Sequence, residues 1–537
     1  MKILLLLLLL ITCNLTVERN SLLDLLTLTR STKMSSTDTS TPTTNEVTIS
    51  YPNSSYTLTQ NDAISTITAT YVGTATGCTI SPSLPSGLSI STSCEISGTP
   101  GAGSPKTTYT VNLTTLEGTG QTTLIVGVRQ SAFLIQKGVA GVNSRADKLA
   151  IAPDTSKLIC GESAGSLDGE TLTGTEAAFF SLFNPGGTRE WTKLLNGSTG
   201  STNCTDVIAA KDGSGFYGVG HTTSSLGGNT LIGNRDIFLG RLDSSGNGTF
   251  LKTKGAAGAT AYATGMDSDS SGNLYIGGYV NGAGLDGNTL TGSSDIFVIK
   301  YDSNGNWLGT VQKGVAGNVS YNYRIYVSST DHIYISGSTQ GSLFRTISST
   351  YDCILIKLDT SLNFLWGIQY GSTDAGKICQ GYNIVEDASG NLIVLGYTGG
   401  NFDGNTVTGS YDGFITKYTT AGSHISTKFF GSAGSTIYTY GMDKDSSHNI
   451  YVSGFVTSSL DGISVTGTGD AFVRMMDADG NFIRSKLIGS AGKNTYGNAI
   501  VVDELDDIYQ VGHTYGSLDG NTLTGNIDYF FTNKNKP

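Results

Sequence analysis

Proline is almost absent from most of this chain, and charge is scarce throughout. Only nine prolines occur, and none lies between Trp191 and Lys536. Strands that are hydrogen-bonded on both sides exclude proline, so this long proline-free stretch favours one β-sheet after another. Charged residues make up 14% of the chain, against about a quarter in ordinary globular proteins. The net charge of -11 argues against a phosphate-backbone partner, so no nucleic acid partner is expected.

Motifs of catalysis and metal binding are also missing. The sequence contains no G-x-S-x-G, no H-E-x-x-H and no glycine-rich phosphate loop ahead of a helix. The five histidines are scattered and the cysteines have no C-x-x-C spacing, so we expect no metal site and no cofactor. No catalytic residue is predicted, although the facing acids of a sugar-cleaving enzyme need not be local in sequence.

Aspartate-rich segments could be read as calcium loops in two copies of the repeat described below. Each begins Asp-x-Asp-x-Ser, at Asp267 and at Asp443. Both have a glycine, Gly278 and Gly454, where the twelfth position of a calcium loop needs a bidentate acid. We therefore interpret these segments as turns, in which Asp and Asn bond their own backbone.

Long apolar runs are limited to the start of the chain. Ile3–Ile11 follows a single lysine, is too short to span a bilayer and has the form of a signal peptide. The run leads through Thr12 into Cys13, which resembles a relaxed lipobox of the kind tolerated in spirochaetes; the alternative is an ordinary secretory signal. The resemblance implies that residues 1–12 are a signal peptide and that lipidated Cys13 anchors the protein in the bacterial cell envelope, at the outer membrane. The Ser/Thr-rich residues 13–46 are predicted to form a tether.

The dominant feature of the sequence is a unit that recurs seven times. A glycine that ends a hydrophobic strand recurs every 58 or 59 residues, at Gly161, Gly220, Gly278, Gly337, Gly396, Gly454 and Gly512. A second anchor is the aspartate that opens a D-x-F-like strand, at Asp236, Asp295, Asp352, Asp412, Asp470 and Asp528. The first copy is the most divergent, with Ala177 in place of this aspartate. Such a period indicates a solenoid, an array or a propeller.

The two ends of the chain decide between these architectures. The last copy ends soon after Asp528 and lacks its fourth strand, but Phe133–Gly138 (FLIQKG) matches the fourth strand of the third copy, Thr310–Gly314 (TVQKG). A ring needs this offset, because pairing both ends in one blade leaves no raw sheet edge. We therefore predict an all-β fold with a seven-bladed β-propeller of four-stranded blades over residues 130–537.

Residues 47–129 are predicted to form a separate β domain. Leu84–Ser89 (LPSGLS) and Ile96–Pro100 (ISGTP) resemble the Ig-like domain family of bacterial surface proteins, which implies an Ig-like β-sandwich. Cys78 and Cys94 bracket the first motif, and we predict a disulfide between them that stabilises the domain by about 3 kcal/mol. The remaining cysteines are left without assigned partners, although the first two lie in neighbouring repeats: Cys160, Cys204, Cys353 and Cys379.

The repeat itself resembles a known bacterial family. Gly272–Tyr279 (GNLYIGGY) and Asp295–Lys300 (DIFVIK) resemble the SBBP β-propeller repeat, which often follows Ig-like domains in spirochaete lipoproteins. The resemblance implies a fold and a location but no activity. A recurring L-D-G or F-D-G motif is interpreted as a turn and not as a ring of functional carboxylates; it contains Asp168, Asp286, Asp403, Asp461 and Asp519.

Candidate ligand contacts come from the repeat positions that face one end of the ring. Counting back sixteen residues from the strand-ending glycine gives Tyr262, Tyr321, Tyr438 and Tyr496. Tyrosine has an apolar face and a polar tip that suit sugars or peptides, but the alternative is that these rings pack between blades. The fourth copy replaces L-D-G by Leu343-Phe344-Arg345, so Phe344 and Arg345 are added as candidates, because function is expected where a regular repeat breaks its rule.

The sequence as a whole predicts a monomeric, membrane-anchored lipoprotein that acts as a non-catalytic binding or adhesion module for a protein or glycan ligand. The loops between strands would contact that ligand, because binding sites concentrate on loops carried by a rigid scaffold. The alternative is a glycan-active enzyme, either a hydrolase or a lyase, that uses the central face of the propeller.

Overall fold

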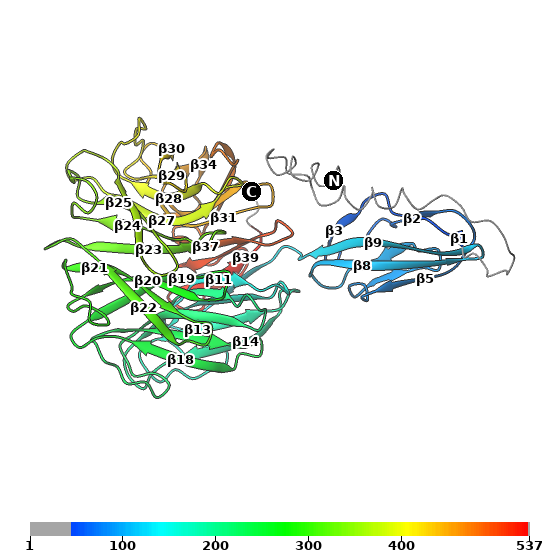
Figure 1. The fold of residues 1–537 in the computed structure, drawn as a ribbon, viewed down its shortest axis with the longest axis horizontal. Helices are drawn as coiled ribbons and strands as arrows, with labels where there is room; N and C mark the ends of the chain where they lie inside the picture. Colours follow the sequence, from blue (N-terminus) through cyan, green and yellow to red (C-terminus); the bar gives the residue numbers. More distant parts are fainter. Residues whose placement is uncertain (1–44, 535–537) are drawn as a thin grey trace, which may run out of the picture.

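The computed structural model describes residues 45–534, and every regular element in this range is a β-strand. Seven four-stranded sheets surround a central channel, and a smaller β domain extends to one side (Figure 1). The predicted all-β fold, an Ig-like domain followed by a seven-bladed propeller, is confirmed. Across residues 45–534 there is no helix with the length and apolarity needed to cross a membrane. Cys13, the predicted signal peptide and most of the predicted tether lie outside the described residues.

The N-terminal domain is built on one five-stranded sheet that carries its core. Its two long strands alternate buried and open residues, and their inward side chains Val111, Leu113, Leu124 and Val126 are fully buried. The strands of this sheet are β1 (Asn45–Glu46), β3 (Ser55–Thr59), β5 (Ala75–Ser81), β8 (Ser104–Thr115) and β9 (Gly118–Arg129). Two short pairs pack against the same core: β2 (Ile49–Ser50) with β4 (Thr70–Tyr71), and β6 (Leu88–Ile90) with β7 (Ile96–Gly98).

Each propeller blade is an antiparallel sheet whose first strand lines the channel. The first three blades consist of β11 (Ser144–Ile151), β12 (Lys157–Ser163), β13 (Ala177–Phe183) and β14 (Arg189–Leu195); β15 (Thr202–Ala209), β16 (Phe216–Thr222), β17 (Asp236–Leu242) and β18 (Gly248–Lys254); and β19 (Thr260–Ser268), β20 (Leu274–Asn281), β21 (Ser294–Tyr301) and β22 (Trp307–Lys313). Each first strand contacts the first strand of the next blade, and the last one contacts β11, so the ring is closed.

The other four blades repeat this plan. They consist of β23 (Ser320–Val327), β24 (Ile333–Thr339), β25 (Asp352–Leu358) and β26 (Phe364–Tyr370); β27 (Cys379–Glu386), β28 (Leu392–Thr398), β29 (Asp412–Tyr418) and β30 (His424–Phe430); β31 (Ile437–Lys444), β32 (Ile450–Val456), β35 (Asp470–Met476) and β36 (Phe482–Ile488); and β37 (Thr495–Val502), β38 (Ile508–Thr514), β39 (Asp528–Thr532) and β10 (Leu134–Lys137). A two-stranded ribbon, β33 (Ser459–Leu460) and β34 (Ile463–Ser464), decorates the sixth blade.

The seventh blade joins the two ends of the propeller. Strand β10 pairs antiparallel with β39, with Leu134 opposite Thr532 and Lys137 opposite Tyr529. The side chains of Tyr529 and Phe531 are fully buried between neighbouring blades. The predicted closure is therefore confirmed, and no sheet edge is left open at the join.

The repeated glycine and aspartate have separate structural roles. The glycine does not end its strand, as the sequence predicted, but lies within the second strand of each blade, because the pairing with both neighbouring strands continues beyond it. At Gly278 an added Cβ would lie 2.0 Å from the Tyr262 carbonyl oxygen and 2.5 Å from the Phe297 ring, so only glycine fits on the second strand between the first and the third. Asp295 is fully buried and accepts hydrogen bonds from the backbone of Thr291 and Gly292. Both anchors fix the scaffold and leave other positions free to vary.

Three disulfides are present, and the predicted bridge between Cys78 and Cys94 is one of them. The other two link adjacent blades: Cys160 with Cys204, and Cys353 with Cys379. Disulfides of this kind are typical of extracellular or periplasmic proteins.

Candidate functional site

The two ends of the channel differ in what covers them. We call the end where the seven first strands begin the mouth, and the opposite end, which carries the turns between first and second strands, the hairpin face. The N-terminal domain contacts the hairpin face, where Arg129 Nη2 donates to the Leu505 carbonyl oxygen at 2.7 Å and Lys106 Nζ donates to that of Glu504 at 2.6 Å. The mouth therefore faces away from the N-terminal domain.

Every first strand has a β-bulge near the mouth, at the same place in each blade. The strand register shifts there by one residue, which adds a side chain to the mouth. The seven bulged residues are Asp147, Thr205, Thr264, Tyr323, Tyr382, Tyr440 and Asn498.

Three further positions per blade surround these bulges. Two are opposite each other on the first and second strands: Arg145 and Glu162, Asn203 and His221, Tyr262 and Tyr279, Tyr321 and Ser338, Gln380 and Tyr397, Tyr438 and Phe455, and Tyr496 and His513. The third position lies just before the third-strand aspartate anchor, and its backbone forms a β-bridge to the neighbouring blade. The residues at this position are Glu176, Arg235, Ser294, Tyr351, Tyr411, Gly469 and Ile527.

Aromatic side chains fill most of these positions from the third blade to the seventh. Adjacent rings touch along the whole arc: for example, the Tyr323 and Tyr382 centroids are 4.7 Å apart, and those of Phe455 and Tyr496 are 4.2 Å apart. We call this arc the aromatic sector; it comprises Tyr262, Tyr279, Tyr321, Tyr323, Tyr351, Tyr382, Tyr397, Tyr411, Tyr438, Tyr440, Phe455 and Tyr496.

The four tyrosines predicted as ligand contacts all lie in this sector. Each is partly exposed and packs against at least one neighbouring ring. Each of these rings therefore packs against a neighbouring ring and is also partly exposed at the mouth. Burial raises the pKa of the neighbouring Tyr279 hydroxyl to about 12, so this group stays protonated and can donate a hydrogen bond at neutral pH.

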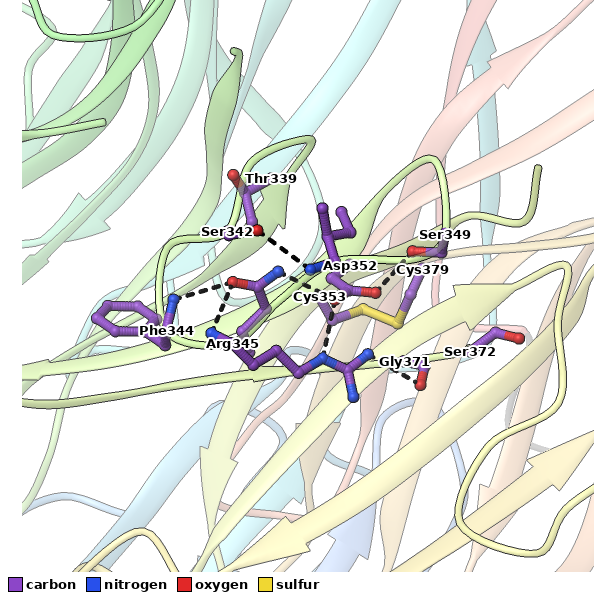
Figure 2. A network of polar contacts seen from close by, with 12 residues as sticks. Thr339, Ser342, Phe344, Arg345, Ser349, Asp352, Cys353, Gly371, Ser372 and Cys379 are labelled. Atoms are coloured by element: carbon purple, nitrogen blue, oxygen red, sulfur yellow. Dashed lines mark hydrogen bonds and ion pairs between the residues drawn. A yellow bond between two sulfur atoms is a disulfide. The ribbon is translucent and has the colours of Figure 1, made fainter. Parts of the chain in front are cut away.

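Phe344 and Arg345 lie in the loop that precedes the third strand of the fourth blade (Figure 2). The Arg345 Nε pairs with Asp352 at 2.9 Å, and its Nη2 donates to the Gly371 carbonyl oxygen at 3.2 Å. The Phe344 ring stacks on Phe364 with the centroids 5.8 Å apart. Arg345 takes the place of the backbone N–H groups that donate to the anchor aspartate in the third blade. Both residues therefore have a structural role, and ligand binding by them remains a prediction.

Charged residues occupy all four positions of the first blade. We call Arg145, Asp147, Glu162 and Glu176 the charged sector. Arg145 Nη1 lies 3.4 Å from Glu162 Oε1. Asn203 Nδ2 donates to Glu162 Oε2 at 2.5 Å and to Glu176 Oε2 at 2.8 Å, so one amide holds two carboxylates side by side.

The carboxyl groups of the charged sector are perturbed by their surroundings. Burial, followed by the charge of Glu162, raises the pKa of Asp147 to about 8. Burial and the nearby Glu176 also raise the pKa of Glu162, against the effect of Arg145. Protonated carboxyl groups beside an open mouth can act as hydrogen-bond donors or acids near neutral pH.

Two histidines flank the charged sector. His221 packs edge-on against Tyr262 with ring centroids 5.2 Å apart, and His513 stacks on Tyr496 at 4.8 Å. Burial lowers the pKa of His221 to about 4 and that of His513 to about 3, so both imidazoles are neutral at physiological pH. Next to His221, the Arg235 guanidinium lies 4.3 Å from the centre of the Tyr262 ring.

Below the mouth the channel encloses a cavity of about 180 Å³. Its strongest contact is an ion pair between Asp206 and Arg324 at 2.7 Å. Asp267 and Asp443 accept hydrogen bonds from the backbone N–H groups of Val327 and Val502 in the following blades, so these carboxylates hold blades together. The Asp-x-Asp-x-Ser segments are turns, as predicted, in which the second aspartate accepts the backbone N–H of the serine. No group of three or more potential ligands within residues 45–534 could hold a metal ion.

Two parts of the chain match family models. Residues 28–129 match the family described as "Putative Ig domain", and residues 483–519, which span parts of the sixth and seventh blades, match the SBBP beta-propeller repeat. No match is found among curated proteins.

Several solved structures are distantly similar to this chain. A polysaccharide lyase (ulvan lyase) is 12% identical with a TM-score of 0.44, over 74% of this chain and 95% of the lyase. The periplasmic gluconolactonase of Pseudomonas aeruginosa is 11% identical with a TM-score of 0.40, over 65% and 87%. A quinonprotein alcohol dehydrogenase-like protein from Bacteroides thetaiotaomicron is 10% identical with a TM-score of 0.38, over 81% and 94%. Likenesses this distant do not identify a ligand or a reaction.

Sequence reasoning missed the charged sector, because it treats the first copy only as the most divergent one. A signal was present in the repeat: Arg145 occupies the tyrosine position, and Glu162 follows the repeated glycine. The bulge that brings Asp147 to the mouth has no such signal, since bulges depend on the pairing of two strands.

Proposed function

We propose that this protein is an exported, lipid-anchored module that binds glycans at the mouth of its propeller. The observation that carries the proposal is the composition of the mouth, in which a continuous arc of aromatic rings meets a cluster of charged and amide groups. Aromatic faces suit the apolar faces of sugar rings, and the polar groups suit their hydroxyls. Because the rings already pack against one another, little side-chain entropy would be lost on binding.

A glycan-binding screen with the purified full chain tests this proposal. One variant changes the four tyrosine candidates to alanine, and the comparison variant is Phe344→Ala/Arg345→Ala, whose residues are held within the fourth blade. We expect the tyrosine variant to lose at least about tenfold in affinity, the equivalent of about 1.4 kcal/mol. An equal loss in the comparison variant would extend the site to Phe344 and Arg345, and unchanged affinity would limit the site to the mouth. Undiminished binding by the tyrosine variant would remove the mouth from consideration, and binding only to host proteins would favour the adhesion role.

The membrane anchor is the second part of the proposal. Cys13 would carry the acyl chains, residues 13–46 would form the tether, and the mouth would then face away from the domain next to that tether. The three disulfides support export, because such bonds persist in oxidising compartments. Mass spectrometry of the mature N-terminus decides the point: an unacylated start downstream of Cys13 would refute the lipid anchor.

A glycan-active enzyme is the second candidate function, and the charged sector favours it. Cleavage of a glycosidic bond needs a proton donor near neutral pH. Asp147 and Glu162 meet that need, since burial raises the pKa of both. An assay of glycan turnover with the wild type, Asp147→Asn and Glu162→Gln separates the two candidates: turnover that both variants abolish favours the enzyme, and binding without turnover favours the module.

A further inference from the structure

The cations of the mouth and channel differ in how their charge is balanced. Arg145 lies beside Glu162 at 3.4 Å, and Arg324 pairs with Asp206 at 2.7 Å. Arg235, in contrast, has no ion pair within residues 45–534. Its buried Nε, like those of Arg145 and Arg324, has no hydrogen-bond partner there. A buried donor without a partner costs free energy unless something else supplies an acceptor.

The Tyr262 ring holds this unbalanced guanidinium in place. The Arg235 guanidinium lies 4.3 Å from the centre of this ring. The Arg235 backbone also forms a β-bridge to Thr260, at the start of the strand that carries Tyr262. A guanidinium stacked on an aromatic face keeps its planar fork of N–H donors free for another partner. That geometry matches the two oxygens of a carboxylate.

His221 lies beside this guanidinium and is neutral. Burial, followed by the charge of Arg235, lowers the pKa of the imidazole to about 4. Its Nδ1 is buried and has no hydrogen-bond partner in the described range. Because the imidazole is neutral at physiological pH, it adds no second cation beside Arg235.

We propose that Arg235, Tyr262 and His221 form a subsite for a sugar that carries a carboxylate, such as a uronate residue of an acidic glycan. The carboxylate pairs with the Arg235 guanidinium, which the Tyr262 ring holds in place. This inference rests on the proposed glycan-binding function and names its ligand class. The nearby acids do not occupy the guanidinium, because Asn203 and Arg145 hold Glu162 and Asn203 also holds Glu176.

The test compares each acidic oligosaccharide with its own neutral form. The full chain is titrated with oligogalacturonate and oligomannuronate, and with the methyl ester of each, at low and at high salt. We expect the acid form to bind at least about tenfold more tightly than its ester at low salt, and the difference to shrink at high salt. This arm needs no variant, so it stands even if a substitution disturbs folding.

Variants then assign the effect to the subsite. Arg235→Gln should weaken binding of the acid form about tenfold and leave the ester unchanged, while Arg235→Lys should keep part of the preference. The matched control is Arg241→Gln, because Arg241 also lies over a tyrosine ring, that of Tyr217 at 5.1 Å, but on the hairpin face. An equal effect of Arg235→Gln and Arg241→Gln would overturn the assignment.

The remaining outcomes separate this inference from the function on which it rests. Equal binding of acids and esters by the wild type would overturn the carboxylate subsite and leave glycan binding intact. Tighter binding of a sulfated oligosaccharide than of either uronate would overturn the carboxylate assignment in favour of a sulfate ester. No binding of any oligosaccharide would overturn both.

Discussion

The first blade and the fourth to sixth blades present the same four backbone positions to the mouth, yet they fill them with opposite chemistry. The first blade has Arg145, Asp147, Glu162 and Glu176, whereas tyrosine and phenylalanine occupy most of these positions in the other three. The bulge, the repeated glycine and the strand register are the same in both regions. The scaffold is therefore specified by one set of repeated residues, and the ligand chemistry by another set that varies between copies.

The difference also separates two kinds of preorganisation. In the aromatic sector, rings such as Tyr323 and Tyr382 support each other by contact. In the charged sector, shared hydrogen bonds hold the side chains in place: the Asn203 amide donates to both Glu162 and Glu176. A disulfide lies at each region: Cys160 with Cys204 between the first two blades, and Cys353 with Cys379 between the fourth and fifth.

The largest expected effect comes from opening the ring that holds both sectors in one mouth. Deletion from Ile527 onward removes β39, whose Phe530 and Phe531 are fully buried and which lies between β10 and β38. We expect loss of cooperative unfolding and aggregation through the exposed strand edges. Size-exclusion chromatography and thermal melts by circular dichroism measure this, with deletion from Lys534 onward as the control that keeps β39. A monomer with native-like melting would contradict the closure.

The sequence predicted this closure, and with it most of the fold, because a ring built from seven copies shows every structural rule several times. The third copy illustrates it: the predicted fourth-strand segment Thr310–Gly314 falls almost entirely within β22, and the predicted D-x-F-like strand at Asp295 falls within β21. The mouth was harder to predict. Its four tyrosine candidates follow from counting residues, but the contacts of Asn203 with two glutamates depend on how neighbouring blades approach each other. Arg345 was singled out for breaking the L-D-G rule, but its contacts with Asp352 and Gly371 hold its loop against the rest of the fourth blade.

Breaking the two inter-blade disulfides should give the next largest effect. From the loops they close, of 44 and 26 residues in sequence separation, we expect losses of about 4 kcal/mol for Cys160→Ala/Cys204→Ala and about 3.5 kcal/mol for Cys353→Ala/Cys379→Ala. Urea unfolding of both variants and the wild type measures these values. The first variant should also lower the affinity for acidic ligands more than the affinity for neutral ones. The second variant should lower the affinity for neutral ligands more. Equal ligand effects would show that the bridges do not act on separate sectors.

A pH titration sharpens the comparison further, because Asp147 of the charged sector titrates near neutrality, whereas burial raises the pKa of aromatic-sector tyrosines such as Tyr279. Asp147 has a pKa of about 8 in the folded protein and 3.8 as its ordinary value, so between these values the folded state holds a proton that the unfolded state has lost. Its contribution to stability therefore falls as pH rises from about 4 to about 8. Asp147→Asn should match the wild type near pH 4 and be the more stable protein at pH 8. Melting temperatures across this range measure the difference, and parallel curves for the two proteins would contradict the raised pKa.

The smallest expected effect concerns a single hydroxyl in the aromatic sector. If that sector binds sugars through ring faces, Tyr438→Phe keeps the face and should change the affinity for a neutral glycan by less than about twofold, which is under about 0.5 kcal/mol. Tyr438→Ala removes the ring, which packs against Tyr397 at 4.9 Å, and should cost about tenfold. Isothermal titration with the methyl-esterified oligosaccharides measures both values. A large loss in Tyr438→Phe would mean that the aromatic sector, like the charged one, selects its ligand by hydrogen bonds.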